Sequence, residues 1–137
     1  MRKELSDEWD DRGVKQGNEY AILTDDITKA WSGMTIRQYK QLKGLKKQNL
    51  RDNMSTLELV LNMLAEATTT EISRTTEPQT FEENREVARP GGRIAGNARK
   101  EIETDTGKPV ITKENAVDFS RLISDVMKES DTDDKNS

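Results

Sequence analysis

The run at residues 54–65, Met-Ser-Thr-Leu-Glu-Leu-Val-Leu-Asn-Met-Leu-Ala, is the only densely apolar stretch of the chain, and it limits where a core can form. Ser55 with Glu58 three residues later has the spacing of a capping box, which predicts that a helix begins here. Met54 and Leu59 are placed for the accompanying hydrophobic staple. Helical spacing gives two apolar faces, one with Leu57, Val60, Leu61 and Leu64 and the other with Leu59 and Met63. Such a helix is expected to be buried at the centre of the fold.

The rest of the chain is polar enough to restrict its class. Apolar residues make up 31% and charged residues 35%, against the ~45–50% and ~25% that are usual in globular proteins. The 137 residues fit one domain. No apolar run approaches the ~20 residues that cross a bilayer, and the first residues, Met1 to Glu4, are not followed by the apolar region of a signal peptide. We therefore expect a cytoplasmic, all-α, compact multi-helix single domain with no membrane partner.

Apolar periodicity predicts further helices on both sides of the central one. Residues 20–31 form an amphipathic pattern that stops near Gly33, and Thr35 is placed to cap a short helix that ends at Gly44. Within the central helix, the β-branched residues that follow Ala67 favour a break or a kink at Thr68.

A long helical pattern covers residues 81–106. Its register crosses Pro90-Gly91-Gly92 without a slip, which predicts either one helix kinked there or two helices stacked end to end. One surface of this helix carries almost no side chains, because it is formed by the small residues Ala88, Gly92, Ala95 and Gly96. This surface is expected to serve close helix packing within the chain or between two copies. A phosphate-binding loop at the same place would need a preceding strand and a Gly-Lys-Ser/Thr sequence, which the chain lacks.

The ends of the chain are expected to differ from its middle. Residues 1–17 look like a polar N-terminal arm that docks through Trp9, and residues 18–128 are expected to form the helical domain, with a last helix at 113–128. Residues 129–137 have nothing to bury and are predicted to be a disordered acidic tail.

The chain has no cysteine and no histidine, which removes several kinds of chemistry. Disulfides, thiolate nucleophiles and cysteine-ligated metals are excluded, and so are the usual general base near neutral pH and the commonest metal ligand. We expect a protein that is not an enzyme, with no catalytic residue, no metal site, no cofactor and no small-molecule substrate. A magnesium nuclease remains as a minor alternative, and its carboxylates would come from Glu58, Glu66, Glu71, Glu82 or Glu83.

Basic residues gather in two stretches and are the candidate contacts to nucleic acid or to an acidic partner. The first stretch carries Arg37, Lys40, Lys43, Lys46, Lys47 and Arg51 before any acidic residue occurs, and the second carries Arg89, Arg93, Arg99 and Lys100. A helix, a glycine turn and a second short helix in the first stretch resemble the outline of a helix-turn-helix, although a lysine stands where that motif packs a small residue. A solvated basic face of a helical connector is the competing interpretation.

One resemblance covers most of the chain. The matching segments are residues 20–24, 43–54, 57–72, 81–84 and 91–100, in conserved order and spacing over about residues 13 to 115. Together they resemble the C-terminal helical region of the DNA-damage-inducible protein D family, without the N-terminal BRO-type phage antirepressor domain of longer members. The resemblance implies an accessory role in the bacterial SOS response or in a mobile element, through interference with RecA-type recombinase filaments on single-stranded DNA.

Two functions of different classes follow from these observations. The first is a non-enzymatic regulator that binds a RecA-type recombinase or single-stranded DNA, with the basic residues facing phosphate. The net charge of −4 and the scarcity of aromatic residues, 4% of the chain, argue for backbone contacts rather than for a dedicated base-reading domain. The alternative is a homo-oligomerising structural or protein-interaction module, related to phage antirepressors, that assembles through the small-residue surface.

Overall fold

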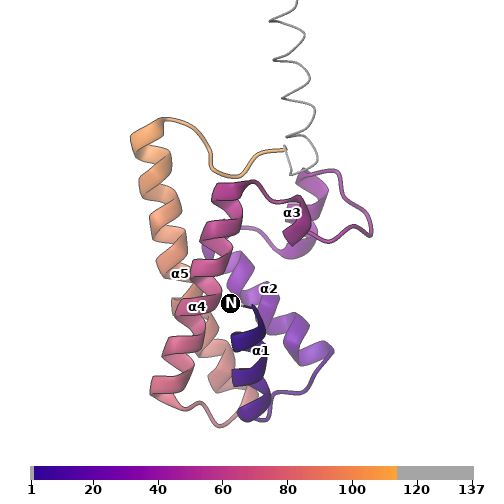
Figure 1. The fold of residues 1–137 in the computed structure, drawn as a ribbon, viewed down its shortest axis with the longest axis vertical. Coiled ribbons are helices and arrows are strands. Elements are labelled where there is room, and N and C mark those ends of the chain that lie inside the picture. The colour runs from indigo at the N-terminus through magenta and orange to yellow at the C-terminus, as the bar shows by residue number, and fades with distance from the viewer. Residues whose placement is uncertain (1, 114–137) are drawn as a thin grey trace, which may run out of the picture.

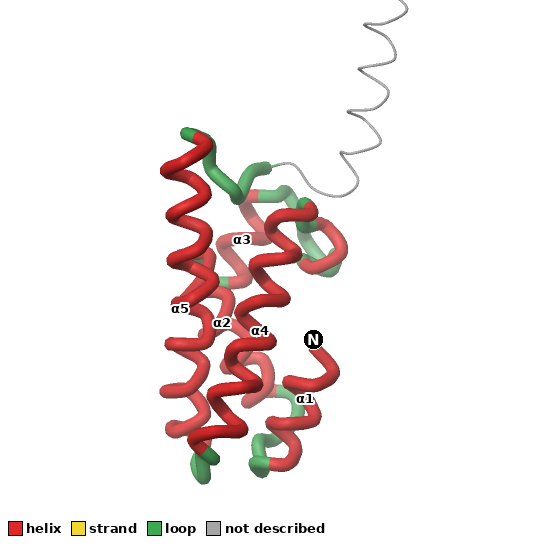
Figure 2. Tube along the Cα trace, turned by 60° about the vertical axis from the view of Figure 1, so that its left-hand side comes forward, coloured by secondary structure: helices red, strands yellow, loops and turns green. Residues whose placement is uncertain are grey.

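The computed structural model describes residues 2–113, and within them the fold is all-helical and compact, as expected (Figure 1). The elements are α1 (Arg2–Asp11), α2 (Asn18–Ser32), α3 (Ile36–Leu42), a 3-10 turn η1 (Arg51–Asn53), α4 (Thr56–Thr76) and α5 (Phe81–Thr106). Helices α2, α4 and α5 pack together, α1 lies against α4, and α3 against α2 (Figure 2). The last helix and the acidic tail predicted beyond residue 113 lie outside the described residues. Within residues 2–113, no helix combines the length and the apolar character that a membrane span requires.

Local sequence explains where the helices begin and end. Capping boxes open three of them, formed by Thr35 with Gln38, Ser55 with Glu58, and Thr80 with Glu83. Helix α2 ends at Gly33 and α5 at Gly107, both with left-handed backbone, which favours glycine. The predicted limits of the helix at 81–106 and the stop at Gly33 are therefore confirmed.

Helix α4 runs through residues 56–76 without interruption, so the predicted break at Thr68 is wrong. The threonine hydroxyls donate to carbonyl oxygens one turn earlier, with Thr68 bonding to Leu64 at 2.7 Å, and Thr69 to Ala65 at 2.8 Å. Because the hydroxyls bond within the helix rather than to non-helical backbone, the β-branched run is accommodated without ending the helix.

The polarity of α4 is the reverse of what its sequence predicts. Its apolar residues Leu57, Val60 and Leu64 are 40%, 53% and 38% exposed. The buried side of the helix is mostly polar and carries Glu58, Leu61, Asn62, Ala65, Glu66, Thr69, Thr70 and Ser73. The expectation of a helix covered all round is therefore wrong. The buried side is polar because polar groups from α1, α2 and α3 meet it, as with the Trp31 indole nitrogen, which donates to Asn62 Oδ1 at 3.2 Å.

The small-residue surface of α5 lies inside the molecule. Ideal Cβ atoms placed on Gly92 and Gly96 would meet the carbonyl oxygens of Ile27 at 2.6 Å and Ala30 at 2.8 Å in α2. Ala88 and Ala95 are fully buried. The surface is thus used to bring α5 close to α2 within one chain, so it is not free to join two copies, which corrects the oligomer alternative.

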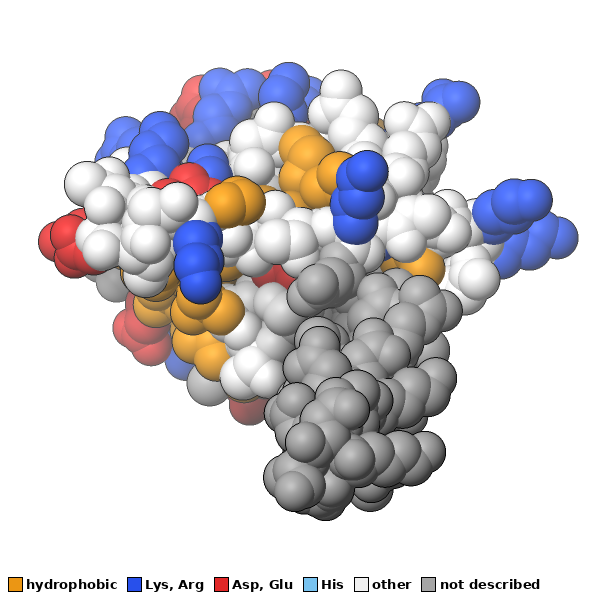
Figure 3. Space-filling view, turned by 90° about the horizontal axis from the view of Figure 1, so that it is seen from above, with side chains coloured by type: hydrophobic (Ala, Val, Ile, Leu, Met, Phe, Trp, Pro, Cys, Tyr) orange, Lys and Arg blue, Asp and Glu red, His pale blue; other side chains and the backbone are white. Residues whose placement is uncertain are grey.

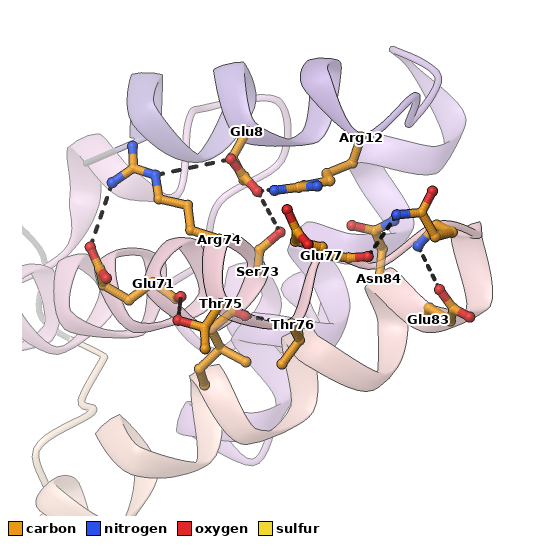
Figure 4. A network of polar contacts seen from close by, with 12 residues as sticks. Glu8, Arg12, Glu71, Ser73, Arg74, Thr75, Thr76, Glu77, Glu83 and Asn84 are labelled. Atoms are coloured by element: carbon orange, nitrogen blue, oxygen red, sulfur yellow. Dashed lines mark hydrogen bonds and ion pairs between the residues drawn. The ribbon is translucent and has the colours of Figure 1, made fainter.

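The N-terminal segment is a helix rather than a polar arm. Leu5 and Trp9, four residues apart, are both buried, and the Trp9 ring packs edge-on against Tyr20 with centroids 5.3 Å apart. Glu8 fixes α1 to α4, because its Oε1 accepts hydrogen bonds from Ser73 Oγ at 2.9 Å and from Arg12 Nε at 2.8 Å (Figure 4). Helix α1 is therefore part of the core.

Candidate nucleic-acid interface

Helix α3 and the loop after it hold one group of basic side chains, of which Lys40 is half-buried and the others are exposed. Arg37, Lys40 and Lys46 line a shallow hollow of about 370 Å³, and Lys47 is exposed beside it in the sequence. We call these four residues the α3 basic surface. Figure 3 looks onto the end of the molecule that carries α3 and shows Lys and Arg side chains standing out at several points around it.

Hydrogen bonds donated by backbone amides hold α3 and the turn after it in place. The Ile36 amide donates to Asp25 Oδ1 of α2 at 2.7 Å, which fixes the start of α3. Gly44 has left-handed backbone, and the Leu45 amide donates to the Lys40 carbonyl at 2.9 Å, so the chain turns back immediately after the helix. Lys46, which follows the turn, is thereby brought to the same hollow as Arg37 and Lys40 of the helix.

No acidic residue occurs between Thr35 and Leu50, and the described residues give the four cations of this surface no salt bridge. Exposed cations without carboxylate partners keep their full charge available to an anionic ligand. The arrangement can hold phosphate groups.

Lys43 does not belong to this surface, which corrects its assignment as a binding residue. Its Nζ lies 3.0 Å from Glu58 Oε2, both side chains are 0% exposed, and Nζ also donates to the Thr112 carbonyl at 3.0 Å. The Tyr39 hydroxyl donates to the other oxygen of Glu58. Lys43 therefore balances a buried carboxylate and cannot reach an external ligand.

Burial raises the pKa of Tyr39 well above its ordinary value, and its hydrogen bond to Glu58 acts in the same direction. The unfolded chain loses this phenolic proton near pH 10, while the folded protein retains it to a higher pH. We therefore expect stability to fall as the pH rises above about 10. Urea unfolding at pH 8 to 11 should show a smaller fall for Tyr39→Phe. An equal fall in both proteins would contradict this assignment.

Two arginines of the predicted set lie outside the α3 basic surface and make contacts that join elements of the fold. Arg51 Nη1 lies 2.8 Å from Glu66 Oε1, and Arg99 Nε donates to the Trp31 carbonyl at 2.8 Å. Arg99 Nη1 also pairs with Glu103 at 2.8 Å. Arg99 joins α5 to the end of α2, so its role is structural.

The remaining predicted cations, Arg89, Arg93 and Lys100, are exposed on α5. This helix packs against α2 and α4, whereas α3 packs against α2, so the two basic groups are carried by different helices. The exposed acids Glu82, Glu86 and Glu101 flank the α5 row and weaken its positive field. The α3 basic surface is therefore the stronger candidate.

The helix-turn-helix outline is wrong for this stretch. After Gly44 the chain forms bends and the short turn η1, and no second helix precedes α4. The α3 basic surface thus has no recognition helix to place in a major groove.

The carboxylates considered for magnesium are separated by their structural roles. Glu58 and Glu83 complete capping boxes, Glu66 pairs with Arg51, and Glu71 lies 3.5 Å from Arg74. Within residues 2–113 no three acidic side chains form a metal-sized cluster.

Sequence reasoning missed Arg2. Its guanidinium lies over the Trp9 ring at 5.1 Å from the centroid and 4.0 Å from Glu66 Oε2. The four-residue spacing of Leu5 and Trp9 was the available signal, because it predicts a helix at the N-terminus that turns Arg2 toward the core. Comparison of this chain with protein-family models, with curated proteins and with solved structures found no match, so the assignment of the interface rests on its own residues.

Proposed function

We propose that this chain is a non-enzymatic binding protein that contacts the phosphate backbone of single-stranded DNA through the α3 basic surface. The observation that carries the proposal is the group of four cations on α3 and its loop, three of them around one hollow, with no carboxylate partner among residues 2–113. The resemblance of the sequence to the DNA-damage-inducible protein D family supplies the setting, which is modulation of a RecA-type recombinase filament in the bacterial SOS response or in a mobile element.

The location of the aromatic residues favours phosphate contact over base stacking. Trp9, Trp31 and Tyr39 are buried, and the Tyr20 hydroxyl donates to the Ser6 carbonyl at 2.9 Å. Stacking platforms for single strands require exposed rings. Binding through the α3 basic surface is therefore expected to tolerate any base sequence and to weaken with salt.

Reversing the charge at Lys46 and Lys47 tests the proposal. The variant with Lys46→Glu and Lys47→Glu should bind labelled single-stranded DNA at least about tenfold more weakly at low salt, because two phosphate contacts become repulsive. Both side chains are exposed, so the thermal unfolding temperature should change little. Fluorescence anisotropy measures the affinity.

The matched control carries Lys15→Glu with Lys108→Glu, which changes the net charge equally at two exposed positions outside the α3 basic surface. This control should lose far less affinity. An equal loss in both variants would mean that only the overall charge matters, and it would remove the α3 basic surface as the site.

A second candidate function is protein recognition by α4. Three large apolar side chains of this helix, Leu57, Val60 and Leu64, face solvent. Contiguous exposed apolar patches are typical of surfaces that bind other proteins. We keep recognition of the recombinase itself as the alternative to direct DNA binding. Measuring DNA binding with and without the recombinase separates the two.

A further inference from the structure

A second basic site is a pocket of about 290 Å³ lined by residues of α1, α2, α3 and α4 and of the segment 49–54. Three cations from different elements line it, namely Arg2, Lys40 and Arg51, together with one carboxylate, Glu66. Only Lys40 also belongs to the α3 basic surface. The pocket is therefore a distinct concave site that adjoins the proposed DNA surface.

One donor of the pocket, Arg2 Nη1, lacks an acceptor. Arg51 Nη1 lies 2.8 Å from Glu66 Oε1, whereas Arg2 Nη1 lies 4.0 Å from Glu66 Oε2 and makes no hydrogen bond with the described residues although that atom is buried. Burial lowers the pKa of Arg2, and the nearby Arg51 charge lowers it further, while Glu66 opposes both. A buried donor without a partner is costly, and an anion bound here would satisfy it.

The charge of the pocket indicates which anion fits. Three cations against one carboxylate leave an excess of two positive charges. A phosphate monoester carries about −1.5 to −2 at neutral pH, while a phosphodiester carries a single charge. Arginine forks also match the geometry of phosphate oxygens. The balance favours a terminal phosphate over an internal one.

The pocket is also lined by four apolar side chains, which we call its apolar wall, namely Ile27, Ile36, Leu50 and Met54. Asn49 and Asn62 line it as well, and the Asn49 side-chain oxygen accepts a hydrogen bond from the Asp52 backbone amide at 3.2 Å. A lining that combines cations with apolar side chains is typical of sites for small ligands with one charged and one apolar part. The volume is close to the lower limit of such sites, so it suits a single nucleotide rather than a dinucleotide.

We propose that this pocket binds a nucleoside 5′-monophosphate group, with the phosphate at Arg2, Arg51 and Lys40 and the base against the wall of Ile27, Ile36, Leu50 and Met54. The group can be a free nucleotide or the phosphorylated end of a DNA strand, since both present the same monoester. Occupation from a strand end would place the following nucleotides beside the α3 basic surface, which shares Lys40 with the pocket.

The test measures binding of adenosine 5′-monophosphate, adenosine and inorganic phosphate to the full chain by calorimetry. The monophosphate should bind saturably, and adenosine at least about tenfold more weakly, because the charge-assisted hydrogen bonds are lost. Absence of saturable binding of the monophosphate at millimolar concentration would overturn the proposal. Equal affinity for inorganic phosphate and the monophosphate would overturn the role of the apolar wall.

Two variants test the pocket at separate positions, so the result does not depend on a single substitution that could unfold the protein. Arg2→Gln should weaken binding of the monophosphate about tenfold, whereas Lys3→Gln, an equal charge change at an exposed position of the same helix, should not. Asn49→Asp retains the oxygen that accepts from Asp52 and adds a negative charge at the pocket, so it should also weaken binding in a folded protein. Equal affinities in Arg2→Gln and Lys3→Gln would contradict the site.

The two sources of the nucleotide are separated with oligonucleotides that carry a 5′-phosphate or a 5′-hydroxyl. A preference for the phosphorylated end that Arg2→Gln abolishes would assign the pocket to strand ends, and saturable binding of the free monophosphate without that preference would assign it to free nucleotides. The variant with Lys46→Glu and Lys47→Glu should keep its affinity for the monophosphate. Failure of the pocket is thereby distinguished from failure of the α3 basic surface, because each is measured with its own ligand.

Discussion

Glu58→Gln should lower the free energy of unfolding by about 3 to 5 kcal/mol, the cost typical of removing one partner of a buried ion pair. Lys43 and Glu58 are both 0% exposed and lie 3.0 Å apart, so the substitution would remove a carboxylate charge that lies directly against a buried lysine. Glutamine serves a capping box as well as glutamate does, so the start of α4 at Ser55 should be preserved. Urea unfolding followed by circular dichroism measures the change.

The double variant with Lys43→Met and Glu58→Gln should recover much of this loss, because it removes both members of the buried ion pair. Glu71→Gln is the matched control at an exposed salt bridge to Arg74 on the same helix, and it should change stability by less than about 0.5 kcal/mol. If Glu58→Gln were as stable as the wild type, the buried pair would have no structural role.

Gly92→Ala should also destabilise the protein, by about 1 to 3 kcal/mol, the range typical of overpacking. Alanine is the better helix former by about 1 kcal/mol, so propensity alone predicts the opposite sign. The added Cβ would lie 2.6 Å from the Ile27 carbonyl oxygen and 2.6 Å from the Ala30 Cβ, so α2 and α5 would have to move apart. Thermal unfolding should show a decrease of several degrees.

Asn97→Ala on the exposed side of the same helix is the control, and it should be as stable as the wild type or slightly more stable. Gel filtration of Gly92→Ala should still show the oligomeric state of the wild type, because the glycine surface faces α2. A change of oligomeric state without loss of stability would instead return this surface to contact between copies.

The helices could be predicted from the sequence because their signals are local. Ser55 with Glu58 and Gly33 set their helix limits through backbone contacts within a few residues. The long pattern at 81–106 also held through Pro90, and α5 is one continuous helix whose glycines pack closely against α2. The all-helical class followed from these same features.

The environment of individual side chains could not be predicted in the same way. The exposure of Val60 and the burial of Glu58 depend on which helices pack against α4, and Lys43 is withdrawn from the basic stretch only because Glu58 and Thr112 meet it in space. Periodicity in one segment carries no information about such partners. The predicted basic set therefore contained the exposed Lys46 and the buried Lys43 alike.

The most direct test of DNA recognition is the affinity of the full chain for labelled single-stranded DNA across a salt series, measured with and without a RecA-type recombinase. The α3 basic surface predicts binding to bare DNA whose logarithm of affinity falls linearly with the logarithm of salt concentration, with a slope of about −2 to −3 for three to four phosphate contacts. Binding only when the recombinase is present would assign recognition to a protein surface such as the exposed stripe of α4. Absence of binding to bare DNA, or binding that salt does not weaken, would contradict the account.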